Sequence, residues 1–368
     1  YSQDGYNDAL KRIGADFNAF TSNDYTNYYM VAASSELDKI MDVESDRFKN
    51  LKYSQELFRT EALAVLGEYN KNASNPISPM IDKLSDLAFS KHTYKHTTIG
   101  FLADVKAMPE GYDYSRRFFN SFYRPENVIL VVVGDVEPEK VSALARKYYG
   151  DWKAGYKAPE VPTEPPLDGP KEARIDWPAP TRPYLMLGYR APAFSTRTVD
   201  SAALSLISQL LFSESAQLYQ ELVVDKQWVD QVSGGSEDSR DPYLFLMYAR
   251  IKSDDLIVPV HKKIDEHVAR LQKELVDAKR LERIKSHLLY SFAAQLDNPE
   301  GVGFQVGSAL SLTGQVETIN QSFEQYQKVT PEDIRRVAQQ TFRAANQVVV
   351  TLSHPVAKTD KPATENGK

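Results

Sequence analysis

Two segments 219 residues apart, measured from Tyr123 to Phe342, carry the same local pattern. In each, an aromatic residue and an arginine precede an asparagine, and a largely apolar run follows at 128–133 and 347–352. Each run comes after a segment with helical periodicity, at 114–122 and 331–341. A continuous β-branched run after a helix is typical of a strand buried on both faces of a sheet. The repeat predicts one α+β unit present twice, although aromatic-Arg-x-x-Asn before a strand also arises by chance.

A proline-rich stretch separates the two copies of this pattern. Residues 157–183 hold eight of the twenty prolines in the chain of 368 residues. Proline at that density blocks helices and stiffens an extended path. We therefore expect a first domain at 1–156, a linker at 157–183, a second domain at 184–357 and a disordered polar tail at 358–368. Each domain should be a mixed, mostly antiparallel sheet with helices packed on one face.

Apolar periodicity places further elements within each half. The expected strands are 17–21, 25–32, 185–190 and 243–252. The expected helices are 6–13, 35–50, 53–71, 198–212, 216–224, 256–278 and 280–295.

Composition excludes several classes of function. The formal net charge is -6 and there is no basic stripe, which argues against a nucleic-acid partner. No apolar run approaches the ~18 residues that a transmembrane helix needs. The start of the chain has neither the basic nor the apolar region of a signal peptide. The chain has no cysteine, which excludes thiolate metal sites and disulfides and fits a periplasmic protein, but equally allows the cytoplasm.

Glu61 and Glu68 are the acidic residues that stand out. They lie seven residues apart, two helical turns, and flank the apolar stripe of the helix expected at 53–71. A carboxylate at such a border is expected to be half buried and to need a cation or a donor. Two salt-bridged surface glutamates would produce the same pattern.

The histidines offer a weaker metal signal. His92 and His96 have an HxxxH spacing that could bind zinc from one helical face, but lysines and threonines around them favour a surface loop. His261 and His267 lie in a helix rich in both charge signs and are expected to be solvated, and His287 and His354 are isolated.

The strand expected at 17–21 has polar ends. At a sheet edge it would offer unpaired N–H and C=O groups to an extended peptide. An ordinary edge strand would look the same.

These segments resemble a known family. Residues 14–29 (GADFNAFTSNDYTNYY) are similar to the strand region just after the metal motif of the pitrilysin/insulinase peptidases, which are zinc enzymes with an inverted H-x-x-E-H motif. Residues 61–68 (EALAVLGE) resemble their second motif, 127–135 (NVILVVVGD) the close of their first domain, and 183–190 (PYLMLGYR) the opening of their second. The similarity runs through nearly the whole chain in order.

The resemblance implies a zinc metalloendopeptidase that cleaves unfolded or short peptides bound as an added β-strand. Carried over by position, Glu68 would be the third zinc ligand and Glu61 the glutamate that supports the catalytic site. Asn18, Ala19, Phe20 and Thr21 would bind the substrate backbone.

The sequence departs from the family in its metal motif. H-x-x-E-H is absent. Counting back from Glu68 by the family's spacing passes residue 1, so the chain is expected to be truncated just after the motif. One carboxylate cannot hold zinc in the three-ligand geometry that activates water, and the chain alone is expected to be inactive.

A second departure concerns the partner. Many family members carry an Arg/Tyr pair in the second domain, where this chain has Val223 and Asp230. We therefore expect the metal-bearing subunit of a heterodimer whose homologous partner supplies the pair. The alternatives are a non-catalytic family subunit and a module that binds peptides without cutting them.

Overall fold

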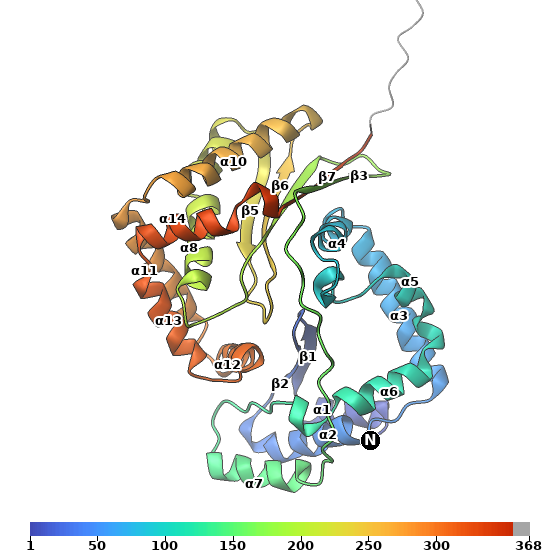
Figure 1. Ribbon diagram of the computed structural model, residues 1–368. Helices are drawn as coiled ribbons and strands as arrows, with labels where there is room; N and C mark the ends of the chain where they lie inside the picture. The colour runs from blue at the N-terminus through green and yellow to red at the C-terminus, as the bar shows by residue number, and fades with distance from the viewer. Residues whose placement is uncertain (356–368) are drawn as a thin grey trace, which may run out of the picture.

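The computed structural model describes residues 1–355 as an α+β protein (Figure 1). The tail expected at 358–368 lies outside the described residues. Short 3₁₀ turns connect several of the main elements. In the first half these elements are α1 (Gln3–Arg12), β1 (Asp16–Thr21), β2 (Thr26–Val31), α2 (Leu37–Asn50), α3 (Gln55–Ala73), α4 (Ile77–Ala88), α5 (Leu102–Ala107), α6 (Tyr112–Phe122) and α7 (Pro138–Tyr149).

The second half contains the larger sheet and its helices. Its strands are β3 (Lys171–Asp176), β4 (Tyr184–Arg190), β5 (Val229–Ser236), β6 (Leu244–Ile251) and β7 (Gln347–Ser353). Its helices are α8 (Asp200–Phe212), α9 (Gln217–Tyr219) with a π-helical turn (Gln220–Asp225), α10 (Ile257–Lys273), α11 (Ala278–Ala294), α12 (Pro299–Thr313), α13 (Thr318–Lys328) and α14 (Pro331–Thr341).

The five strands of the second half form one mixed sheet in the order β3-β7-β4-β6-β5. β3 and β7 are parallel and the other neighbours antiparallel, which confirms the predicted α+β class with a mixed sheet. Helices α8, α10, α11 and α14 cover one face. The helices of the second half thus pack on one face of its sheet, as predicted, whereas α4 of the first half packs on the other face (Figure 1).

Alternation along the strands explains the two-faced core. In β6, Phe245 and Met247 point to the helices of the second half, whereas Leu244 and Leu246 point to α4. Gly188 of β4 lets α4 approach closely, since a Cβ there would lie 2.9 Å from a methyl carbon of Leu84. Burial on both faces is the reason why the central strands β4, β6 and β7 read as apolar runs, whereas the edge strands β3 and β5 do not.

The first half holds a two-stranded antiparallel hairpin, β1–β2. The hairpin lies between α1 and α2 on one side and α12 of the second half on the other (Figure 1). Each half thus contributes one helix that packs on the strands of the other half: α4 covers the large sheet and α12 covers the hairpin.

The repeated segments share a local conformation. The Tyr123 N–H donates to the Phe119 carbonyl oxygen at 2.9 Å, and the Phe342 N–H donates to the Ala338 oxygen at 3.0 Å. A 3₁₀ turn follows each helix, at Pro125–Asn127 and Ala344–Asn346. These matches support a duplication, which stays a prediction for the whole domains.

The two runs after these turns differ in burial. β7 is a buried strand, as predicted, with Val348 and Val350 fully buried. Residues 128–133, which the structure describes, form no strand, and Ile129 and Leu130 are 53% and 49% exposed. The prediction of a buried strand there was wrong, because no strand within residues 1–355 pairs with the run and its side chains are half-buried or exposed.

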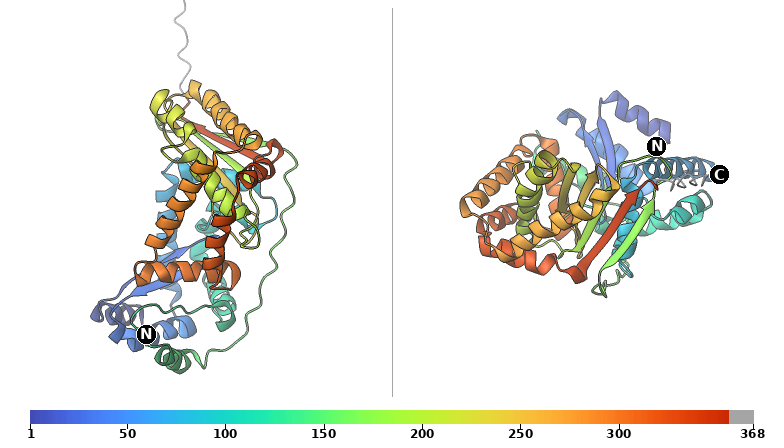
Figure 2. Two further views of the ribbon diagram at one scale, coloured as in Figure 1. Left: turned by 90° about the vertical axis from the view of Figure 1, so that its left-hand side faces the viewer. Right: turned by 90° about the horizontal axis from the view of Figure 1, so that it is seen from above.

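The connection between the halves is long and extended. Residues 157–170 contain no helix or strand and run along the molecule (Figure 2). Within the expected linker, residues 171–176 form β3, an edge strand of the large sheet. Glu164 anchors the connection, since its carboxylate accepts from the N–H groups of Ser90, Lys91 and His92 at 2.7–2.8 Å.

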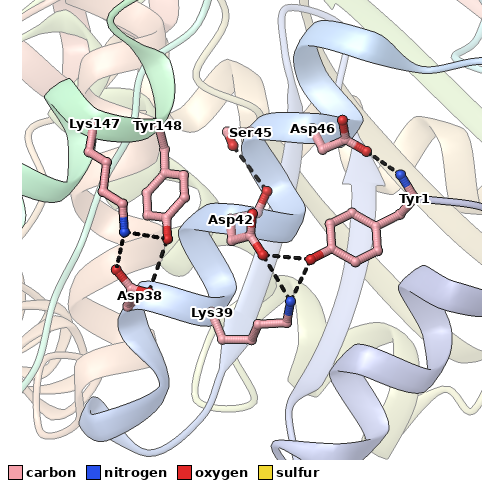
Figure 3. Close-up of polar contacts among 8 residues, drawn as sticks. All are labelled: Tyr1, Asp38, Lys39, Asp42, Ser45, Asp46, Lys147 and Tyr148. Atoms are coloured by element: carbon pink, nitrogen blue, oxygen red, sulfur yellow. Dashed lines mark hydrogen bonds and ion pairs between the residues drawn. The ribbon is translucent and has the colours of Figure 1, made fainter.

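Polar contacts fix α2 beneath the hairpin (Figure 3). Asp38 accepts from Lys147 Nζ at 3.1 Å and from the Tyr148 hydroxyl at 3.0 Å, which ties α2 to α7. Asp42 accepts from Lys39 Nζ at 2.8 Å on the same helix. These exposed ion pairs each contribute little stability; the Asp38 contacts connect α2 to α7, whereas the Lys39–Asp42 pair lies within α2.

Candidate functional site

The register of the β1–β2 hairpin leaves a free edge on β1. The Ser22 N–H donates to the Tyr25 carbonyl oxygen at 2.8 Å, which closes the hairpin with a hydrogen-bonded pair. Because bonded and non-bonded pairs alternate along an antiparallel ladder, the backbone groups of Phe17, Ala19 and Thr21 point away from β2. An extended peptide could therefore pair with these positions.

The four residues predicted to bind substrate all lie on β1 and are exposed. Asn18 and Phe20 share one face of the strand, and Ala19 and Thr21 share the other. The Asn18 side chain reaches the edge, where its Oδ1 accepts from the Ala19 N–H at 2.8 Å. A peptide carbonyl at this position would replace Oδ1 as the acceptor. The binding role of these four residues stays a prediction.

Glu61 and Glu68 lie on α3, the helix predicted around them. Both are exposed, so the expectation of half-buried carboxylates was wrong. The reason is that α3 packs on α4, α5 and α6 through one face and fully buries only Ala62.

Glu61 borders a largely apolar cavity of about 330 Å³ between α1, α2 and α3. Its wall includes Tyr6, Val43, Leu51 and Phe58. Glu61 is therefore the only one of the two glutamates that lines this cavity within residues 1–355.

The described residues do not form a complete metal site. No three His, Cys, Asp or Glu side chains among residues 1–355 come together in a group that could hold a metal ion. Glu68 could supply a single carboxylate ligand, and a catalytic zinc needs three protein ligands. The residues present therefore do not fit zinc by themselves.

Two histidines are placed differently from the sequence predictions. His92 is buried at the junction of the halves, not in a surface loop; its Nδ1 accepts from the Tyr94 N–H at 3.0 Å, and its Nε2 lies 3.3 Å from Asp241 Oδ2. His267 is also buried, not solvated, with Nε2 3.0 Å from Glu221 Oε2.

Glu221 and His267 line a polar cavity of about 520 Å³ beside the π-helical turn. Partial burial raises the pKa of Glu221, but hydrogen bonds from His267 and Lys263 outweigh it and hold this pKa below its usual value.

A polar contact that the sequence patterns did not reveal joins the hairpin to the second half. Asp24 accepts from the Tyr94 hydroxyl at 2.6 Å and from the Arg240 N–H at 3.0 Å. Burial raises the pKa of Tyr94, and the Asp24 contact raises it further. The only local signal was the position of Asp24 in a turn between two strands, which does not identify a distant partner.

The positions that align with the family's Arg/Tyr pair lie in the second half. Asp230 on β5 is bound by Arg182 at 2.8 Å and Arg250 at 2.6 Å. Val223 lies in the π-helical turn and packs against the core. Val223 and Asp230 therefore provide neither the guanidinium group nor the phenol group of the Arg/Tyr pair.

No helix within residues 1–355 combines the length and apolar character needed to cross a membrane.

Two curated relatives cover most of the chain. The chain is 26% identical to the zinc protease PqqE of Helicobacter pylori over 93% of its length and 77% of that protein. It is 20% identical to the mitochondrial-processing peptidase subunit beta of Dictyostelium discoideum, over 95% of this chain and 75% of that one.

Solved structures share the fold. A protease from Helicobacter pylori superposes with a TM-score of 0.87 at 26% identity, over 95% of this chain and 84% of that chain. The periplasmic protease PqqL from Escherichia coli superposes with a TM-score of 0.74 at 17% identity, over 95% of this chain and 40% of that chain.

Two family models match successive parts of the chain. Residues 1–100 match the insulinase domain of peptidase family M16, and residues 111–288 match the domain described as the M16 inactive domain. Together with relatives that span most of the sequence, these matches confirm the predicted resemblance: the chain belongs to the M16 (insulinase/pitrilysin) family of zinc peptidases.

Proposed function

We propose that this chain is the substrate-binding part of an M16 zinc metalloendopeptidase that acts on unfolded or short peptides. The free edge of β1 is the observation that carries the proposal. Its outward N–H and C=O groups suit an added strand, and Asn18, Ala19, Phe20 and Thr21 border that strand. Recognition through the backbone fits loose side-chain specificity.

Peptide hydrolysis needs more than these 368 residues contain. We propose that Glu68 supplies one zinc ligand and that Glu61 supports the site, while an H-x-x-E-H segment supplies the other ligands and the base. Zinc, when bound at such a site, would activate water and polarise the scissile carbonyl.

The uncovered surface of the first half supports a role for such a segment. Ile129 and Leu130 are about half exposed, whereas Val348 and Val349, which occupy the matching positions of the repeat, are 0% and 6% exposed. The difference arises because β7 lies between β3 and β4 and residues 128–133 have no such neighbours within residues 1–355. A strand and helix resembling β4 and α8 would cover the run.

The exposed face of α6 leads to the same proposal. Phe118 is 44% exposed, whereas Val337, its counterpart on α14, is buried against α8 and the sheet. A helix in the position of α8 would bury Phe118. We propose that the motif-bearing segment occupies this place.

We propose that a homologous subunit supplies the Arg/Tyr pair, since Asp230 is engaged in two ion pairs and Val223 packs in the core. One relative is itself named as a peptidase subunit. The periplasmic structural relative supports a periplasmic location, and the absence of cysteine is compatible with this location and equally with the cytoplasm, which is the alternative. We retain 1–156 and 184–357 as the two domains.

A peptide-binding module is the second candidate function. The free edge of β1 is present although the described residues form no metal group, so this chain could bind peptides without cutting them. A non-catalytic subunit of a larger peptidase would have the same features.

Zinc titration and a peptide-cleavage assay separate these functions. The chain, repurified free of metal, should neither bind zinc tightly nor cleave a fluorogenic peptide. Fused behind the H-x-x-E-H segment of a relative, it should cleave the peptide. Glu68→Gln should abolish that cleavage, whereas Glu56→Gln, an exposed glutamate on the same helix, should not.

Activity of the chain alone, or of the fused Glu68→Gln variant, would contradict this assignment. Size-exclusion chromatography with light scattering on the native complex tests the subunit proposal. A fully active homodimer would refute it.

A further inference from the structure

The β1–β2 hairpin has one face covered by the first half and one covered by the second. Phe17 packs edge-to-face on Tyr6 of α1, with ring centroids 6.3 Å apart. On the other face, Phe304 of α12 lies 5.9 Å from Phe20 and 5.0 Å from Tyr29, again between ring centroids. The second half therefore reaches the strand that we propose to bind substrate.

The hairpin cannot shift freely beneath α12. Asp24, in the turn, accepts from the Tyr94 hydroxyl and from the backbone N–H of Arg240 in the β5–β6 loop. The position of Phe20 relative to Phe304 is thus set by a polar contact at the turn and by aromatic packing on the sheet face.

A peptide added to the edge of β1 extends the sheet, so its side chains alternate between the two faces. On the α12 face it would lie beside Asn18 and Phe20. Phe20 keeps 41% of its surface exposed, although Phe304 and Tyr25 contact its ring. The exposed part of a ring already held by neighbours is a suitable surface for an apolar side chain on the adjacent strand.

We propose that Phe304, acting through Phe20, forms a subsite for an aromatic or large aliphatic side chain of the bound peptide. This inference rests on the proposed binding of peptides at β1. Phe304 is a positioning residue: it holds the Phe20 ring against the face of the sheet, and the Phe20 ring contacts the peptide.

Peptide selectivity tests the subsite. Two labelled, unstructured peptides of identical sequence, except for phenylalanine or serine at one central position, are titrated with the 368-residue chain and followed by fluorescence anisotropy. An aromatic cross-strand contact predicts a preference for the phenylalanine peptide of about two- to five-fold.

Phe304→Ala should reduce this ratio to about one and leave the affinity for the serine peptide unchanged, because the backbone pairing remains. Phe304→Leu, which keeps apolar bulk, should retain part of the preference. Phe292→Ala is the control: Phe292 packs on Phe323 in the second half, and its loss should leave the ratio unchanged. A preference that survives Phe304→Ala, or an equal loss of affinity for both peptides, would overturn the subsite.

A separate variant tests the proposed function itself. Ala19→Pro removes an N–H that faces the free edge without removing a β1–β2 hydrogen bond, and should abolish binding of both peptides while circular dichroism stays unchanged. Undiminished binding by this variant, or no binding by the unmodified chain, would refute strand addition at β1. If the wild-type chain binds both peptides and Ala19→Pro binds neither, strand addition at β1 is supported. The Phe304→Ala result alone then decides whether the subsite exists.

Discussion

Replacing Glu164 by glutamine should destabilise the protein at neutral pH and make it less sensitive to acid. The Glu164 carboxylate accepts from the backbone N–H groups of Ser90, Lys91 and His92 and from the Ser90 hydroxyl, at 2.7–2.8 Å. It anchors the extended connection to the turn after α4. A neutral amide lacks the negative charge that strengthens these hydrogen bonds. Its NH2 group would also place a donor opposite the backbone N–H donors.

The magnitude follows from the pKa of this carboxyl group. Partial burial raises the pKa of Glu164, but the backbone hydrogen bonds outweigh it and lower the pKa from 4.5 to about 2. Roughly 1.4 kcal/mol per pKa unit makes about 3.5 kcal/mol an upper value. Because the side chain is only half-buried, solvent screening reduces the expected effect to about 2 kcal/mol.

The sign of the pH dependence is determined by the lowered pKa. The stabilisation is fully present above the unfolded-state pKa near 4.5 and is lost as the pH falls through about 2. Urea unfolding of wild type and Glu164→Gln should therefore differ by about 2 kcal/mol at pH 7, with a difference that shrinks as the pH falls below 4.5.

The neighbouring exposed Glu160 provides the control, since Glu160→Gln should change the unfolding free energy by less than about 0.5 kcal/mol. The reasoning fails if Glu164→Gln and Glu160→Gln have equal stability at pH 7. It also fails if the Glu164→Gln deficit is the same at pH 7 and pH 2.5.

Two further substitutions test packing and the contact between the halves. Gly234→Ala places a Cβ 2.4 Å from Phe212 Cε2 and should lower the free energy of unfolding, measured in urea, by about 1–3 kcal/mol. Gly235→Ala is the control and should be tolerated, because its Cβ would lie 3.5 Å from the nearest atom. Asp24→Ala removes the acceptor of the Tyr94 hydroxyl and should cost about 1.5–3 kcal/mol by the same measurement; a change below 0.5 kcal/mol would show that the contact does not hold the hairpin.

Local patterns predicted most of the secondary structure. The helix predicted at 331–341 coincides with α14, and the strands at 17–21 and 185–190 match β1 and β4 within a residue. The long helix predicted at 256–278 ends at Lys273, because the last residues carry the connection to α11. These elements depend on periodicity and turn residues, which neighbouring positions determine.

The candidate site could also be predicted only in part. The motifs around Asn18 and Glu68 were sufficient to predict the family, and the resemblance to that family implied the edge position of β1, which the polar ends of the strand alone did not decide. The exposure of Glu61 and Glu68, and the burial of His92 and His267, were not predictable. A helical pattern shows which face is apolar, but the degree of burial depends on elements distant in the sequence.

The sequence by itself determined most of the local elements, the recurring sequence pattern and the family to which the chain belongs. The tertiary structure alone decided that Val348 is buried and Ile129 is exposed at equivalent positions of the repeat, and that α12 of one half lies over the hairpin of the other. The physical reason is that helix and strand propensity act over a few residues, whereas burial is set by whichever distant segments occupy the space around a side chain.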